Sequence, residues 1–217
     1  MAAADLPQPS SRRRAATAAR RRGNGDANRR TQLVRVAARL FRERGFNGTT
    51  VRDIAQAVGM RSGSPFYYFD SKEQILFAVM EEGLRVGLVR SEAAVASGGS
   101  ARQRFAKLVR AHLGILLEDG SDFIPVMLYE WRRLPASYRR RLIAVKDRYD
   151  ALWQQLIAEL IAQGALRGDP KLARLLILGA VNFAATWYRR NGPLSIDQLA
   201  HATTEFFLTP ARSGKAR

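Results

Sequence analysis

Residues 49–72 read TTVRDIAQAVGMRSGSPFYYFDSK and carry the clearest structural signal in the sequence. Apolar residues recur at positions 51, 54, 55 and 58, which is the spacing of one helix face. Thr50 precedes this face as an expected N-cap, because its hydroxyl oxygen can accept an otherwise unpaired backbone N–H. Gly59 follows at a point where a residue without Cβ turns at least cost. The pattern predicts a short helix that ends in a sharp turn.

A second short helix is expected over residues 62–69, with Ser62 as its N-cap. Pro65 would then be the third helical residue, inside the first turn, where a missing N–H needs no partner. The motif SKEQ at 71–74 fits a capping box and predicts the start of a longer helix. Two short helices joined by a glycine turn are typical of a helix-turn-helix motif, which reads the major groove of DNA.

The composition of the chain favours a nucleic-acid partner. The 217 residues carry a net charge of +17 and include no cysteine, which excludes disulfides and thiolate metal sites. Eight arginines fall within residues 1–30. We expect residues 1–27 to form a basic arm without ordered structure, which is either a solvated tail or a contact to DNA phosphates.

Neither a membrane span nor a secretory signal is expected. The longest uncharged stretch, 175–188, has 14 residues, which is too short to cross a bilayer. The arginine-rich start lacks the apolar segment of a secretory signal. These patterns predict a soluble, cytoplasmic protein.

The remaining pattern is helical, and we expect an all-α fold of about nine helices. Glycine, proline and short polar linkers divide the apolar periodicity, and no alternating strand pattern or internal repeat is present. The expected helices are 28–44, 51–58, 62–69, 71–96, 101–118, 123–133, 136–163, 170–190 and 195–208.

Residues 37–76 resemble the DNA-binding domain of the TetR family of transcriptional regulators. The matching elements are Ala38-x-Leu40-Phe41-x-x-x-Gly45-Phe46, Thr49-Thr50-Val51-x-x-Ile54-Ala55, residues 59–69, and Ser71-Lys72-Glu73. The resemblance implies a homodimeric repressor that binds a palindromic operator in double-stranded DNA and is released by a small-molecule effector. It implies a helix-turn-helix domain at 28–74, a helical ligand-binding and dimerisation domain at 75–209, and a flexible tail at 210–217. No cofactor and no metal site are expected.

The resemblance also assigns DNA contacts residue by residue. Thr50, Tyr68 and Lys72 would contact phosphates, whereas five residues would face the groove: Arg52, Arg61, Ser62, Ser64 and Tyr67. Plainer explanations remain open, because Tyr67 and Tyr68 also suit packing and Arg52 or Lys72 also suit a solvated surface. Three residues depart from the family pattern: Phe66 stands at a usual tyrosine, Pro65 at a leucine-like core position and Arg61 at a common serine cap.

A dimerisation face is expected on the helix at 170–190. Its residues Leu176, Gly179, Ala180, Phe183 and Trp187 recur at helical spacing, and the two small residues permit close approach of another helix. The face suits either an intermolecular bundle or an intramolecular core. Residues of the last helix would complete the same bundle, namely Leu199, Ala202, Thr203, Phe206 and Phe207.

Candidates for the effector site are large or polar-tipped residues of the C-terminal helices, namely Met127, Trp131, Trp153, Asn182 and Trp187, together with Phe123 and Tyr149. Aromatic residues at helical spacing are more often core residues, but an amide such as Asn182 in an apolar helix needs partners. The clusters 132–133 and 139–141 are either a solvated basic face or a site for an anionic group such as the phosphates of a CoA thioester. Residues 129–134, with 187–189, are similar to TetR-type repressors that sense acyl-CoA esters.

Two other classes of function are alternatives to a DNA-binding regulator. The sequence has two histidines far apart and no phosphate-binding glycine loop or HExxH motif, so nothing favours an enzyme. The alternative is a constitutive, sequence-tolerant nucleic-acid-binding protein without a ligand. Positive charge alone would suffice for such a protein to bind nucleic acid. The capping and turn residues of 49–72 instead favour an ordered helix-turn-helix.

Overall fold

The computed structural model describes residues 11–118 and 120–209, with side chains from residue 26 onward, and all regular structure in these residues is helical. It contains eight α-helices and two short 3-10 helices, which confirms the all-α class. None of the described helices is long and apolar enough to cross a membrane. The elements are α1 (Ser11–Arg44), α2 (Val51–Ala57), η1 (Ser64–Tyr67), α3 (Lys72–Ala96), α4 (Ala101–Leu117), α5 (Phe123–Glu130), η2 (Trp131–Arg133), α6 (Ala136–Ala162), α7 (Pro170–Trp187) and α8 (Ile196–Phe207).

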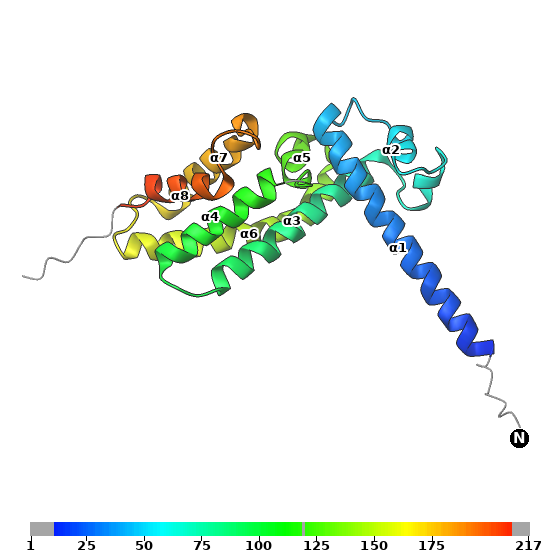
Figure 1. Ribbon diagram of the computed structural model, residues 1–217, viewed down its shortest axis with the longest axis horizontal. Helices are drawn as coiled ribbons and strands as arrows, with labels where there is room; N and C mark the ends of the chain where they lie inside the picture. The colour runs from blue at the N-terminus through cyan, green and yellow to red at the C-terminus, as the bar shows by residue number, and fades with distance from the viewer. Residues whose placement is uncertain (1–10, 119, 210–217) are drawn as a thin grey trace, which may run out of the picture.

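The helices enclose two hydrophobic cores that share α3. The first core joins α1, α2 and the first half of α3 to α5 and the start of α6. The second joins the end of α3 to α4, α6, α7 and α8, with the fully buried Trp153 edge-on to Phe105 at 6.1 Å between ring centroids. In Figure 1, α1 and α2 lie at one end of the molecule and α8 at the other, with α3, α4 and α6 side by side between them. The helix-turn-helix is therefore continuous with the C-terminal helices.

The first helix begins earlier than predicted. It starts at Ser11 instead of residue 28, so residues 11–27 of the expected basic arm have helical backbone. Alanine and arginine are strong helix formers, and their abundance in this stretch outweighs the glycines at 23 and 25. Residues 1–10 of the arm and the tail at 210–217 lie outside the described residues.

Thr50 is the N-cap of α2, as expected. The preceding residue, Thr49, connects the start of α2 to the end of α1. Thr50 accepts a hydrogen bond from Asp53 N at 3.1 Å, and the Asp53 carboxylate accepts one from Thr50 N at 2.7 Å. The hydrogen bonds from Thr50 lower the pKa of Asp53. The buried Thr49 hydroxyl donates to Leu40 O and Gly45 O at 3.1 and 3.0 Å. The turn between α1 and α2 is thus held by side-chain bonds to backbone carbonyls.

The second helix of the motif is shorter than predicted. It is the 3-10 helix η1, capped by Gly63 and not by Ser62, with Pro65 in its second position. Ser62 is excluded as the cap because it lies inside a turn closed by Ser64 N and Arg61 O at 2.9 Å. The buried Pro65 supplies the carbonyl that accepts from the N–H groups of both residues 68 and 69, at 2.9 and 3.0 Å.

The predicted capping box at α3 is only half formed. Ser71 is the N-cap, and its hydroxyl accepts from Gln74 N at 3.1 Å. The Gln74 side chain accepts from Asp70 N instead of Ser71 N. The Gln74 side chain therefore fixes Asp70, the residue before the cap. Asp70 ends the stretch 61–70 between α2 and α3, which we call the reading segment.

We predict that Thr49→Val lowers the free energy of unfolding by about 0.5–1.5 kcal/mol, because it removes the bonds of the buried hydroxyl to the carbonyls of Leu40 and Gly45. Denaturant titration measures this change. Thr31→Val is the control, since the exposed Thr31 hydroxyl donates to Ala27 O in solvent and its loss should cost less than about 0.5 kcal/mol. Equal losses in the two variants would contradict a structural role for the buried hydroxyl.

Candidate DNA-contact surface and effector cavity

The predicted groove-facing residues surround an exposed reading segment. Arg52, Arg61 and Ser62 are exposed, and Ser64 is half-buried. Tyr67 is 76% exposed and contacts Tyr68 edge-on, at 4.9 Å between ring centroids. Such a patch of guanidinium, hydroxyl and aromatic groups beside a helix-turn-helix can contact both bases and phosphates.

The three consecutive aromatic residues of this segment have three different environments. Tyr67 faces solvent, whereas Phe69 is buried under the Arg30 guanidinium, which lies 4.9 Å from its ring centroid. Tyr68 is half-buried, and its hydroxyl donates to Asp26 Oδ1 at 3.4 Å. Burial, with the nearby Asp26 carboxylate, raises the pKa of Tyr68. Tyr68 therefore connects the reading segment to α1.

Lys72 forms internal hydrogen bonds at the start of α3. Its ammonium donates to Phe46 O at 2.8 Å and to Thr49 O at 2.9 Å, and it lies 4.1 Å from the centroid of the Phe46 ring. These bonds place the Lys72 ammonium next to Thr50, the N-cap of α2. Thr50 and Lys72, which are both expected to contact phosphates, are therefore neighbours. The Thr50 hydroxyl donates to Asp53 Oδ2 at 2.6 Å, so both side chains have partners in the protein.

Sequence reasoning did not assign Phe66 to the surface. Its side chain is 55% exposed within the reading segment, next to Tyr67. The neighbouring residues in the sequence do not distinguish an exposed phenylalanine from a core phenylalanine. The exposure of Phe66 therefore becomes known only from the packing of η1.

A cavity of about 260 Å³ lies between α3, α4, α5, α6 and α7, and we call it the central cavity. Its walls are mostly apolar and include Met127, Leu128 and Leu178. Gly87 of α3 makes room for it, since a Cβ there would lie 3.2 Å from Ile115 Cδ1 and 3.7 Å from Tyr149 Cε2. A concave apolar site with a few polar groups is typical of a small-molecule site.

Three side chains form a hydrogen-bonded chain along the central cavity. The Tyr149 hydroxyl bonds His112 Nδ1, and His112 Nε2 bonds Asn182 Oδ1 at 2.8 Å. Burial lowers the pKa of His112 to about 4 and raises the pKa of Tyr149 to about 12, so both groups are neutral at pH 7. With Asn182 Oδ1 as acceptor, Nε2 carries the imidazole proton and Nδ1 accepts from Tyr149. The Asn182 amide N–H₂ has no partner among the described residues and can donate to a ligand.

A charged cluster borders the same cavity on α6 and α7. Asp150 accepts from Arg174 at 2.9 Å and from Lys146 at 2.6 Å. Arg174 also donates to Gln154 at 3.1 Å. The cavity thus combines an apolar interior with a charged edge.

The candidate effector residues divide into two groups. Met127, Tyr149 and Asn182 line the central cavity, whereas Phe123 lines a separate cavity between α1 and α3. Trp131, Trp153 and Trp187 lie elsewhere: Trp153 is a core residue edge-on to His112, Trp131 packs against the first core, and Trp187 is exposed on α7. A large aromatic residue fills a core equally well, and the pattern alone did not separate the two roles.

Sequence reasoning missed four polar residues of the central cavity: His112, Lys146, Asp150 and Arg174. The available signal was a single histidine among the apolar residues of α4, because a buried imidazole needs partners just as a buried amide does. Those partners come from α6 and α7, far away in the sequence.

The predicted apolar face of α7 is exposed to solvent. Leu176, Phe183 and Trp187 are 61%, 64% and 48% exposed, and no atom lies within 4 Å of a Cβ built at Gly179. On α8, Phe206 is also exposed, whereas Leu199 is buried in the second core. The intramolecular alternative is therefore excluded for this face of α7.

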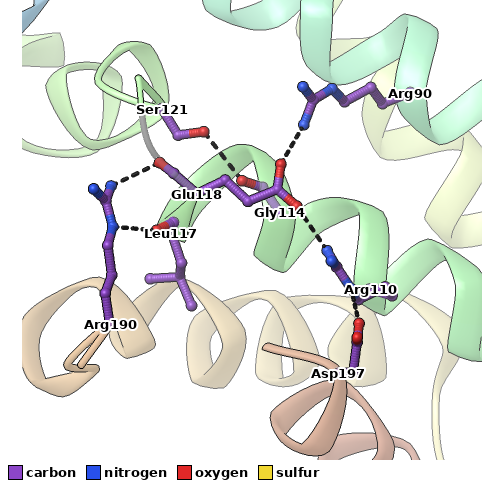
Figure 2. Close-up of polar contacts among 8 residues, drawn as sticks. All are labelled: Arg90, Arg110, Gly114, Leu117, Glu118, Ser121, Arg190 and Asp197. Carbon is purple, nitrogen blue, oxygen red and sulfur yellow. Dashed lines mark hydrogen bonds and ion pairs between the residues drawn. The ribbon is translucent and has the colours of Figure 1, made fainter. Parts of the chain in front are cut away.

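A charged junction closes the end of α4 (Figure 2). The Glu118 carboxylate accepts from Arg90 of α3 at 3.1 Å and from Arg110 at 3.0 Å, and Arg110 also bonds Asp197 of α8. Burial acts to raise the pKa of Glu118, but hydrogen bonds from these arginines outweigh it and lower the pKa. Arg190 donates to Leu117 O and Glu118 O at 2.7 and 2.6 Å. The junction joins α3, α4 and α8.

Comparisons with known proteins agree with this geometry. Residues 33–79 match the family model of bacterial regulatory proteins, tetR family, and residues 98–210 match the tetracyclin repressor-like C-terminal domain. The chain is 31% identical, over 82% of its length and 88% of the relative, to the HTH-type transcriptional repressor KstR2 of Rhodococcus jostii (strain RHA1).

Two solved structures are similar over most of their length. The structure of AibR in complex with isovaleryl coenzyme A and operator DNA has a TM-score of 0.77 at 25% identity, covering 82% of this chain and 97% of that one. The ketosteroid transcriptional regulator KstR2 of Mycobacterium tuberculosis has a TM-score of 0.72 at 26% identity, covering 83% and 95%. The first relative is thus bound to operator DNA, and the second is a transcriptional regulator by name.

We predict that burial of His112 makes the free energy of unfolding depend on pH. Its pKa is about 4 in the folded protein, below the ordinary value of 6.5, so the unfolded chain binds more protons between these values. Stability is therefore lost as the pH falls from 6.5 to 4, by about 1.4 kcal/mol per pH unit from this group.

The test compares urea unfolding of the wild type and His112→Gln from pH 7.5 to 4.5. The stability difference between the two should shrink as the pH falls, because the variant lacks the titrating group. His201→Gln is the control, since His201 is exposed, and it should follow the wild type. A constant difference between His112→Gln and the wild type would rule out a buried neutral imidazole.

Proposed function

Because the chain belongs to the TetR family of bacterial regulatory proteins, we propose that it represses transcription by binding a palindromic operator as a homodimer, from which a small-molecule effector releases it. The observation that carries the proposal is the exposed reading segment between α2 and α3, with Tyr67, Arg52 and Arg61 around it. The two family models and the KstR2 relative concern transcriptional regulators, so we propose no catalytic activity.

The DNA contacts divide into two kinds. Arg52 and Arg61 suit guanine edges in the major groove, because a guanidinium can donate two hydrogen bonds to one guanine. Ser62, Ser64 and Tyr67 would contact the groove or the flanking backbone, while Tyr68 and Lys72 would contact phosphates. A phosphate contact by the Thr50 hydroxyl would displace its bond to Asp53. The arginines at the start of α1 add sequence-independent attraction to the phosphates.

The homodimer would form through the exposed apolar face of α7, with Phe206 of α8 beside it. Gly179 and Ala180 permit close approach of a partner helix between the larger Leu176 and Phe183 side chains. A two-fold axis through this face gives the two reading segments the symmetry of an inverted repeat. An exposed apolar face of this size on a monomer is itself a reason to expect a partner.

The effector would occupy the central cavity, and we propose that it is a thioester of coenzyme A. AibR, a structural neighbour, is described in complex with isovaleryl coenzyme A. The cavity volume of about 260 Å³ is at the low end for ligand sites, so it suits an acyl group but not a whole coenzyme. The free N–H₂ of Asn182 would donate to the thioester carbonyl. Ligand binding must favour one spacing of the reading segments, since equal affinity for both would shift nothing.

The experiment that tests the regulator is selection of bound duplexes from a random DNA library. We expect a consensus with two inverted half-sites one or more helical turns apart, and binding that survives excess random DNA. The alternative, a constitutive sequence-tolerant binder in the cytoplasm, would yield no consensus and would be displaced by the competitor.

We predict that Lys72→Ala weakens binding to the selected duplex, by a similar factor for all sequences. The slope of log affinity against log salt should fall by about one for each protomer, because one phosphate contact is lost. Fluorescence anisotropy over a salt series measures both quantities.

Lys107→Ala is the matched control for this variant. Lys107 also donates to two oxygens, Ser97 Oγ and Gly98 O, but at the opposite end of α3. Thermal unfolding of both variants must be recorded, because Lys72 also holds the turn before α2. An unchanged salt slope in folded Lys72→Ala would refute the phosphate assignment.

We predict that Phe183→Arg converts the dimer to a monomer, because it places two charges in an apolar interface. Light scattering coupled to gel filtration should report half the mass. Val89→Arg is the control, since Val89 is also an exposed apolar residue but belongs to α3 and not to α7 or α8. A dimeric Phe183→Arg would place the interface elsewhere.

A further inference from the structure

A second cavity, rich in arginine, lies next to the central cavity. It has a volume of about 580 Å³ and lies between α1, α3 and the segment joining α4 to α5. Arg35 and Arg39 of α1 and Arg90 of α3 line it, and we call it the arginine cavity. Its lining differs from the apolar walls of the central cavity.

Two arginines of this cavity, Arg35 and Arg39, keep their donors available for a ligand. Hydrogen bonds from Arg85 lower the pKa of Glu82, and the charge of Arg35 adds to this effect only at longer range. The acidic residues of this cavity are already bound: Glu82 accepts two hydrogen bonds from Arg85, at 2.8 and 2.7 Å, and Asp122 accepts from Arg42 at 2.7 Å. Neither Arg35 nor Arg39 makes an ion pair or hydrogen bond with the described residues. The cavity therefore presents a surplus of positive charge.

The geometry of α1 directs both free guanidinium groups to one side. Arg35 and Arg39 are one helical turn apart and so lie on the same face. A neighbouring cavity of about 370 Å³ shares Arg35, Glu82 and Phe123 with the arginine cavity and adds Arg30, Arg85 and Glu81. Arginines therefore outnumber carboxylates in both cavities between α1 and α3.

The two cavities share a wall made of two side chains. Ile115 of α4 and Ile124 of α5 line both the central cavity and the arginine cavity. Next to this wall, α3 packs closely against α5 at Gly83. A Cβ at Gly83 would lie 2.8 Å from Phe123 Cβ and 3.5 Å from Ile124 Cδ1, so the contact requires glycine. Rotation of two isoleucine side chains is a small change for a connection between the cavities.

We propose that the arginine cavity binds the phosphorylated head of an effector whose acyl group occupies the central cavity. The ligand class is a coenzyme A thioester, which joins a nucleotide with several phosphates to an acyl chain through a long, narrow linker. Guanidinium groups bind phosphates in paired hydrogen bonds, and Arg35 and Arg39 are free to do so. This inference deepens the proposed function and rests on its effector class.

Binding at this position acts directly on the reading head. Arg35 and Arg39 belong to α1, whose first core holds α2, while Arg90 belongs to the part of α3 near the second core. Phosphates held between them favour one distance between α1 and the end of α3. The ligand thereby distinguishes between two domain arrangements, as release from an operator requires.

The experiment measures binding of unacylated coenzyme A to the full chain by titration calorimetry without DNA. Arg35→Gln/Arg39→Gln should raise the Kd about tenfold for each charged hydrogen bond lost. Arg167→Gln/Lys171→Gln is the matched control: it removes the same charge from two exposed side chains that line neither cavity and should leave the Kd unchanged. Melting curves of both variants should match the wild type, because all four side chains are exposed.

Several outcomes would overturn the inference. They are absence of coenzyme A binding to the wild type at millimolar concentration, an unchanged Kd in Arg35→Gln/Arg39→Gln, or an equal loss in the control. Pyrophosphate binding as tightly as coenzyme A at the same arginines would reduce the site to a general anion site. Isovaleryl coenzyme A should bind more tightly than coenzyme A, since its acyl group adds burial in the central cavity.

The regulator proposal fails or holds independently of this result. Duplex selection uses no ligand, and the calorimetry uses no DNA. A chain that selects an inverted repeat but does not bind coenzyme A overturns only the ligand inference. A chain that binds coenzyme A through Arg35 and Arg39 but selects no sequence overturns only the regulator.

Discussion

Sharing one helix between two hydrophobic cores is the constraint on which this structure depends. The start of α3 is buried against α1 and α2, and its later residues pack with α4 and α6. A helix transmits a displacement along its length, because its backbone hydrogen bonds resist stretching. The reading segment and the central cavity are therefore coupled through α3 without any flexible linker between them. Lys72 strengthens the coupling at one end, since it bonds the turn that precedes α2.

The polar chain in the central cavity gives this coupling a chemical basis. Burying Tyr149, His112 and Asn182 among apolar side chains is unfavourable unless their hydrogen bonds are made, and each bond joins two different helices. The chain fixes the relative positions of α4, α6 and α7 while leaving one amide N–H₂ free. A ligand that bonds this group enters a network that is already ordered. Local polarity in an otherwise apolar core is the usual mark of a functional site.

Features that arise from neighbouring residues could be predicted from the sequence, whereas features that arise from packing could not. The helical class and the Thr50 cap follow from short-range periodicity and turn chemistry, whereas Tyr67 is assigned to the groove by the family resemblance. The shortened η1 was missed because the turn that displaces Ser62 depends on how Pro65 is buried. His112 and Asn182 lie 70 residues apart, and no local pattern indicates that they meet. The open face of α7 shows the same limit, since its spacing fitted both a core and an interface until its exposure was known.

The junction at Glu118 has a consequence for communication between subunits. One carboxylate serves two guanidinium groups, and the second of these, Arg110, also bonds Asp197 at the start of α8. Arg90 lines a cavity, so any anion that binds there competes with Glu118 for it. Loss of that bond leaves Glu118 to Arg110 alone and redistributes charge toward α8, beside the seam where two copies would meet. In the proposed homodimer, an anion bound in the arginine cavity of one subunit would thereby change the charge close to its neighbour.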